Sequence, residues 1–158
     1  VGLVGVQFFQ ASSVPPIHNI STDVADPPVF DKIVALRGAG TNSLDYDADA
    51  LGPVQQQAYP WVRTLVTPRA PEDAIRQTVR TLEGMGLVIV HVDETTGIVE
   101  ATDTTFWFGF KDDVVVRIRP DSSGGSRVDL RSVSRVGMSD LGVNARRIGQ
   151  FLDRFEKA

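Results

Sequence analysis

The densest polar chemistry in the chain lies in residues 129–148, DLRSVSRVGMSDLGVNARRI. Arginines and serines alternate with apolar residues in its first half, and glycines separate them from further arginines and an asparagine. Arginine presents a planar guanidinium that binds carboxylate or phosphate through two parallel hydrogen bonds. The segment therefore indicates a catalytic site, an anion site, a docking surface, or a structural corner between a strand and a helix.

A basic sheet face is the strongest candidate for a binding surface. Along a strand at 126–136, side chains alternate between two faces, so Val128 and Leu130 point toward covering helices and the arginines point away. The preceding strand, 113–120, turns two more arginines to that side. Residues 114–136 hold five arginines and two aspartates, a local charge of 5 − 2 = +3 in an acidic protein. The predicted binding arginines are Arg117, Arg119, Arg127, Arg131 and Arg135.

Three interpretations of this face stay open. The arginines dock a protein or a membrane-protein complex, they bind a small anionic or amphipathic ligand in a pocket beneath the preceding chain, or they are covered within the fold. Exposed ion pairs contribute only about 0.2–1 kcal/mol each, so pairing with Asp129 alone does not explain the choice of arginine. The acidic loop with Asp45, Asp47 and Asp49 could supply the cover.

The corner that follows the strand has a structural and a chemical interpretation. Gly137 ends the strand, and Ser139 or Asp140 caps the first free amides of the last helix. Asn144 is placed where an inward-turned amide could tie this helix to the strand. Because a helix start attracts anions, Ser139 and Asn144 also form a candidate anion site. The pattern Gly-Met-Ser-Asp-Leu-Gly matches neither a phosphate loop nor a nucleophile elbow.

An aromatic stretch, TTFWFGFKDD, lies at residues 104–113. Phe106, Phe108 and Phe110 alternate with other residues, which predicts that they pack in the core. Trp107 then lies on the opposite side, beside the arginines. Because tryptophan is enriched at interfaces, Trp107 joins the predicted binding surface.

The sequence predicts no catalytic group, metal site or cofactor. Its two histidines, His18 and His91, form no cluster of the three or four ligands that zinc requires, and the chain has no cysteine. We expect a protein that is not an enzyme. An unrecognised hydrolase is the third hypothesis, and it requires one of these histidines within hydrogen-bonding reach of a serine or a carboxylate.

The elements that position these residues begin at Pro71. PEDAIRQTVRTLEGMG predicts a helix, because proline opens it, acidic residues occupy its first turn and an apolar stripe follows. Strands are predicted at 87–94, 98–104, 113–120 and 126–136, and a last helix starts near Ser139. Short turns indicate antiparallel pairing. We predict an α+β fold, with a four-stranded antiparallel sheet and two helices on one face.

An extended arm, residues 15–70, is predicted to wrap around the domain formed by 71–158. Seven of the nine prolines fall in this part of the chain, and proline interrupts regular elements. One or two helical turns are expected near 29–36 and 53–58.

The first residues and the composition limit the function further. Residues 1–14 begin with the charge-free VGLVGVQFF, which indicates the end of a membrane anchor or signal, or a buried strand. Contact with a membrane through this segment is expected. A net charge of −4 argues against nucleic-acid binding.

Three stretches carry a resemblance: PPIHNISTDVADPPVF, GIVEATDTTFWFGFKDDVVVRIRP and RVDLRSVSRVGMSDLGVNARRIGQFL. Together they resemble the bacterial domain of unknown function family 1499 (DUF1499), over nearly the whole chain. Its members are often membrane-associated or exported, and no activity or catalytic residue set is established for them. The resemblance implies a bacterial, membrane-associated or periplasmic location. We expect an accessory domain that docks on a protein or membrane complex.

Overall fold

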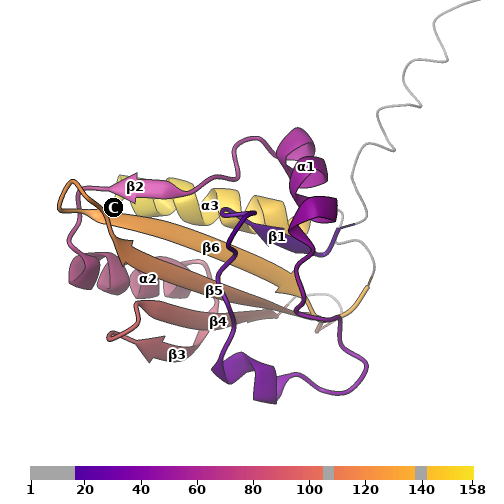
Figure 1. Ribbon diagram of the computed structural model, residues 1–158. Helices are drawn as coiled ribbons and strands as arrows, with labels where there is room; N and C mark the ends of the chain where they lie inside the picture. Colours follow the sequence, from indigo (N-terminus) through magenta and orange to yellow (C-terminus); the bar gives the residue numbers. More distant parts are fainter. Residues whose placement is uncertain (1–16, 105–108, 138–141) are drawn as a thin grey trace, which may run out of the picture.

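A computed structural model describes residues 17–104, 109–137 and 142–158. The predicted α+β class is confirmed: an antiparallel sheet carries helices on one face, and the proline-rich arm crosses the other face (Figure 1). The prediction of four strands is wrong, because the sheet has six. The two additional strands come from the arm.

The four predicted strands form a meander. They are β3 (Val88–Asp93), β4 (Ile98–Thr104), β5 (Lys111–Pro120) and β6 (Ser126–Ser134). The arm adds β1 (Asn19–Ser21) and β2 (Leu65–Thr67), and both pair antiparallel with β6. The sheet order is β1-β6-β5-β4-β3, with β2 beside another part of β6. Each arm strand has three residues, too few for a recognisable alternation of side chains.

Two helices cover the sheet face opposite the arm. α2 (Pro71–Gly84) begins as predicted, with Glu72 and Asp73 in its first turn. α3 (Val143–Lys157) begins later than the expected start near Ser139. Gly142 precedes it with a φ of 83°, a left-handed conformation that no residue of a right-handed helix adopts.

The arm contains two short helices. A 3₁₀-helix, η1 (Lys32–Leu36), lies within the predicted region 29–36, but α1 (Ala48–Ala58) is longer than the turn or two expected. Its start is fixed by Asp47, whose side chain accepts a hydrogen bond from the Ala50 N–H at 3.1 Å. Part of the acidic stretch therefore begins a helix.

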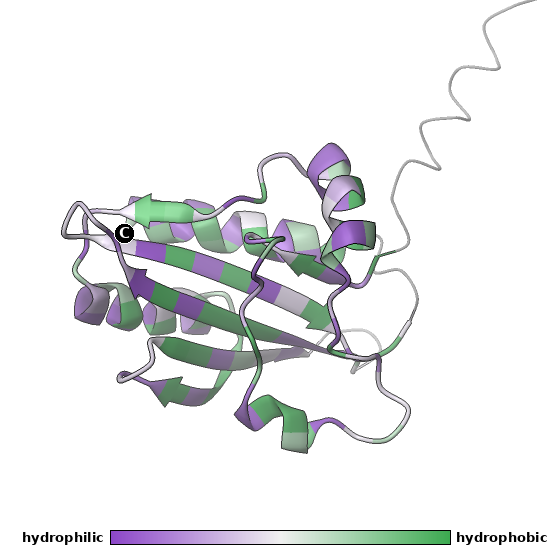
Figure 2. Cartoon of the chain, viewed as in Figure 1, coloured by the Kyte–Doolittle hydropathy of each residue, from purple (hydrophilic) through white to green (hydrophobic). Residues whose placement is uncertain are grey.

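The sheet carries apolar residues on both faces, and Figure 2 shows polar and apolar residues alternating along β5 and β6. Toward the helices, Val116 and Leu130 pack in one cluster with residues such as Phe151. Toward the arm, Val115 and Val133 pack with Phe30 and Ile33. The predicted orientation of both strands is confirmed. The arm thus contributes residues to the apolar clusters on both faces of the sheet.

Among the helices that the structure describes, none combines the length and apolar character needed to cross a membrane.

Candidate functional site

The arm covers the middle of the arginine face, beginning with Arg117. This side chain is buried, with 6% of its surface exposed. Its Nη2 lies 3.3 Å from Asp23 Oδ2 of the arm and 3.5 Å from Asp129 Oδ2 of β6. Asp129 Oδ1 in turn accepts hydrogen bonds from the hydroxyls of Thr22 and Thr64, at 2.7 and 2.6 Å. Arg117 and Asp129 therefore join the ends of the two arm strands to the sheet.

Arg131 holds three further segments of chain and is 4% exposed. Its guanidinium donates to Asn19 Oδ1 at 2.9 Å, to the Pro28 carbonyl at 3.1 Å and to the Leu44 carbonyl. The rings of Phe30 and Tyr46 lie 5.4 and 5.7 Å from the guanidinium carbon. Burial lowers the pKa of Arg131 to about 10, so the group stays protonated at neutral pH. Such a site has no room for an external anion.

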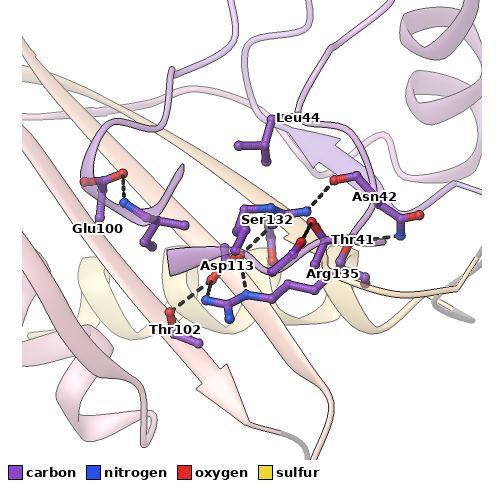
Figure 3. A network of polar contacts seen from close by, with 12 residues as sticks. Thr41, Asn42, Leu44, Glu100, Thr102, Asp113, Ser132 and Arg135 are labelled. Carbon is purple, nitrogen blue, oxygen red and sulfur yellow. Dashed lines mark hydrogen bonds and ion pairs between the residues drawn. The ribbon is translucent and has the colours of Figure 1, made fainter. Parts of the chain in front are cut away.

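Arg135 binds a carboxylate of the protein itself. Its Nε and Nη2 donate to the two oxygens of Asp113, each at 2.8 Å. Arg37 from the arm approaches the same carboxylate at 2.6 Å, and the Thr102 hydroxyl donates to it at 3.0 Å (Figure 3). Asp113 is completely buried, and its hydrogen bonds raise the pKa of Arg135.

Glu100 fastens the 3₁₀-helix and was missed by the sequence prediction. Its buried carboxylate accepts hydrogen bonds from the backbone N–H groups of Asp31, Lys32 and Ile33, at 2.7, 2.9 and 3.4 Å (Figure 3). These are free donors at the start of η1. The sequence signal was a charged residue in the middle of a predicted strand, between Val99 and Ala101.

The prediction of an open arginine face is therefore wrong for Arg117, Arg131 and Arg135, because arm and strand groups already occupy them. Asp23 supplies the cover for Arg117. The chain at the start of the acidic loop lies over Arg131, through the Leu44 carbonyl and the Tyr46 ring. The space between arm and sheet is filled by the apolar cluster around Phe30. A pocket there for a small ligand would need that cluster to move.

Two predicted arginines remain exposed at the far end of this face. Arg119 and Arg127 lie directly opposite one another on β5 and β6. Asp26 Oδ2 lies 3.2 Å from Nη2 of Arg119. Binding by this pair stays a prediction. Trp107, placed beside the arginines by the sequence analysis, lies outside the described residues.

In the described part of the corner after β6, Asn144 has the structural role that one of the two interpretations required. The Asn144 side chain accepts hydrogen bonds from Ser132 Oγ at 2.5 Å and Arg147 Nη1 at 2.7 Å. It donates to the His18 carbonyl at 3.2 Å and to Ser134 Oγ at 2.8 Å. The amide thus ties α3 to β6, and both of its N–H groups are used within the fold. The anion site proposed for Asn144 is therefore wrong, and Ser139 lies outside the described residues.

Arg147 extends this corner into a buried ionic cluster. Its Nη2 lies 2.8 Å from Asp112 Oδ2 and 2.9 Å from Asp103 Oδ2. Burial raises the pKa of Asp112, although Arg147 opposes the change. The two carboxylates neutralise the Arg147 guanidinium within the fold, so this group is not available to an external ligand.

A groove lies between β2 and α3, and the sequence analysis did not find it. We call it the docking groove. Two hollows, of about 300 and about 470 Å³, meet in it at Leu65 and Glu156. The residues lining these hollows include Trp61, Arg63, Leu65, Val66, Arg69, Leu152, Asp153, Phe155 and Glu156. The available signal was the β-branched run in RTLVT, between Pro60 and Pro68.

Trp61 packs against Tyr59 and α3 in the docking groove, although 49% of it is exposed. Its ring packs edge-to-face on Tyr59, with centroids 5.4 Å apart. On α3, a Cβ atom added at Gly149 would lie 3.3 Å from the indole Nε1, so glycine permits this close packing. The indole is thus positioned before any partner arrives.

Catalysis finds no support in the geometry of the histidines. In the part of the chain that the structure describes, neither His18 nor His91 has a side-chain hydrogen bond to a serine or carboxylate, which the hydrolase hypothesis requires. Within those same residues, no three histidine, aspartate or glutamate side chains lie close enough together to hold a metal ion.

Comparisons with known proteins give a family and a partial structural similarity. A family model described as "Protein of unknown function (DUF1499)" matches residues 19–155. No curated protein has a significantly similar sequence. Among solved structures, the crystal structure of Ara h 8.0201 has a TM-score of 0.44 and 14% sequence identity. That match covers 60% of this chain and 93% of the other.

Proposed function

Because the chain belongs to the DUF1499 family, whose description assigns no activity, we propose a function from the geometry: a non-enzymatic docking domain that binds another protein through the docking groove. The carrying observation is Trp61, which is half-exposed, packs against Tyr59 and lines one of the two adjoining hollows. The proposal keeps the docking function expected from the sequence. It places the binding site at the edge of the sheet instead of on the buried arginines.

Trp61 has the properties of an interface anchor. Tryptophan is among the residues whose truncation costs most binding energy, particularly when it lies near the centre of an interface. Fixing its ring before binding reduces the entropy lost in the complex. Leu65 and Leu152 provide apolar surface on either side of the groove, so a partner side chain can be enclosed between strand and helix.

The rim of the docking groove carries charges of both signs. Arg63 and Arg69 lie on the β2 side, and Asp153 and Glu156 lie on α3. Rim charges mainly govern association rate and the rejection of wrong partners. This pattern favours a polypeptide with charges of both signs over a bulk anionic surface or nucleic acid.

A membrane-associated or periplasmic location remains part of the proposal. Its support is the apolar, charge-free start of the sequence, VGLVGVQFF. On this view the partner is a protein of a membrane complex, and the N-terminal segment keeps the domain near it.

Affinity purification of the tagged full chain from detergent-solubilised native membranes tests the proposal. Trp61→Ala should weaken the affinity for the partner about 30-fold, which corresponds to the roughly 2 kcal/mol typical of an interface anchor. The amount of partner recovered should fall accordingly. Val34→Ala is the matched control, since Val34 is also half-exposed but lies on η1. Circular dichroism must show both variants folded. Equal recovery of the partner with wild type and Trp61→Ala would contradict the proposed site.

A further inference from the structure

The outer edge of β6 is completed in two halves, by β1 and by β2 (Figure 1). In an antiparallel pair, successive residues turn their N–H and C=O groups alternately toward and away from the partner. The Leu130 carbonyl accepts from Thr22 N–H at 2.9 Å, and the Ser134 N–H donates to the His18 carbonyl at 2.9 Å. Even-numbered residues of β6 therefore face this edge.

The register then fixes the direction of the β2 backbone. Leu65 lies opposite Val128 and Thr67 lies opposite Ser126, so these two residues take the ladder hydrogen bonds. Val66 lies between them, opposite Arg127. Its N–H and C=O consequently point away from β6, toward the outside of the sheet.

The β1 half of the edge is closed by a side chain. Ser21 is the residue of β1 whose backbone points outward, and Gln55 of α1 binds it. The Ser21 N–H donates to Gln55 Oε1 at 3.0 Å, and Gln55 Nε2 donates to the Ser21 carbonyl at 2.6 Å. The buried Gln55 amide thus takes the place of a neighbouring strand.

The β2 half has no such cover among the described residues. Val66 is 54% exposed and lines the larger hollow of the docking groove. We propose, on the basis of the docking function above, that the partner enters as an extended segment that adds a strand to β2. The segment forms hydrogen bonds with the Val66 N–H and C=O, which is the main-chain mode of strand addition.

Side chains on the two faces of β2 define the chemistry of this segment. On the arm face, Val66, Arg127 and Arg119 form one cross-strand row. Asp26 already pairs with Arg119, so Arg127, next to Val66 in this row, is the arginine that an acidic side chain from the partner can reach. On the helix face, Trp61 and Leu65 favour an apolar side chain. The partner is an extended segment in which acidic and apolar residues alternate.

The opposite sheet edge is less suited to strand addition. β3 carries a register shift between Ile89 and His91. A bulge of this kind twists an edge strand and protects it from pairing.

A peptide selection tests strand addition on the full chain. Random 12-residue peptides displayed on phage are selected against the folded protein, and a recovered peptide is synthesised for titration. The expected sequences alternate acidic and apolar residues. Nuclear magnetic resonance then follows amide hydrogen exchange, and the Val66 N–H should become at least tenfold more protected when the peptide binds. Leu65 and Thr67, already in the ladder, should change much less.

Two substitutions at the same position separate main-chain from side-chain binding. Proline is tolerated on an edge strand where the N–H faces outward, so Val66→Pro should fold. It should weaken the peptide at least tenfold more than Val66→Thr, which keeps the N–H and the branched shape. Unchanged Val66 exchange in wild-type protein, with binding still lost in Trp61→Ala, would overturn strand addition and leave the docking function standing. A selection without any Trp61-dependent peptide would count against both.

Discussion

At the scale of single residues, buried ionic groups fasten the arm to the sheet. Arg131 reaches three separate segments because its guanidinium has several donors in a fixed plane, which lysine lacks. Asp113 and Glu100 perform the same task with carboxylates. The choice of arginine on this face, which suggested a binding surface, is explained mainly by these internal contacts.

The buried carboxyl of Asp112 predicts a pH dependence of stability. Burial raises its pKa in the folded state, so the folded protein retains a proton that the unfolded chain has already released. Wild type should therefore lose stability relative to Asp112→Asn as the pH rises from about 4 toward the raised pKa, and the difference should then become constant. Urea unfolding at a series of pH values measures it.

Glu94→Gln, a change in an exposed turn, serves as the control for that measurement. A difference between wild type and Asp112→Asn that is flat across this range would show that the carboxyl is not desolvated as the structure indicates.

At the scale of elements, strong local signals were predictable and long-range pairings were not. The pattern from Pro71 to Gly84 contains a start, an apolar stripe and a stop, so α2 follows from the sequence. β1 has three residues, and Asn19 pairs with Val133, more than a hundred positions away. The alternation in β5 and β6 gave the correct orientation of the arginines. It could not show that the arm lies over them, because cover depends on tertiary packing.

Gln55 provides a prediction at this scale. Gln55→Ala removes the two hydrogen bonds to Ser21, and a long one from the Tyr46 hydroxyl, and leaves the Ser21 N–H and C=O without partners inside the fold. The free energy of unfolding should fall by about 1–3 kcal/mol. Gln56→Ala, on the exposed side of the same helix, is the matched control and should change it by less than about 0.5 kcal/mol. Urea denaturation measures both. Equal effects of the two substitutions would show that Gln55 does not close the edge.

At the scale of the whole molecule, the arm and the sheet form one structure in which, among the described residues, β2 leaves part of the sheet edge uncovered. The arm supplies two strands and part of both apolar clusters. It buries the centre of the arginine face but leaves β2 accessible, so the docking groove lies where arm, sheet and α3 meet. The candidate site could not be read from the sequence, because Trp61 and Gly149 come together only through the packing of the arm on α3.

Site-specific photocrosslinking in intact cells tests the docking groove most directly. A benzoylphenylalanine at position 63, on the rim of the groove, should give one discrete adduct with a partner protein. The same group at position 34 on η1 should not give that adduct, and adding Trp61→Ala to the position-63 protein should abolish it. An adduct from position 34 but none from position 63, or a position-63 adduct that survives Trp61→Ala, would contradict docking at this groove.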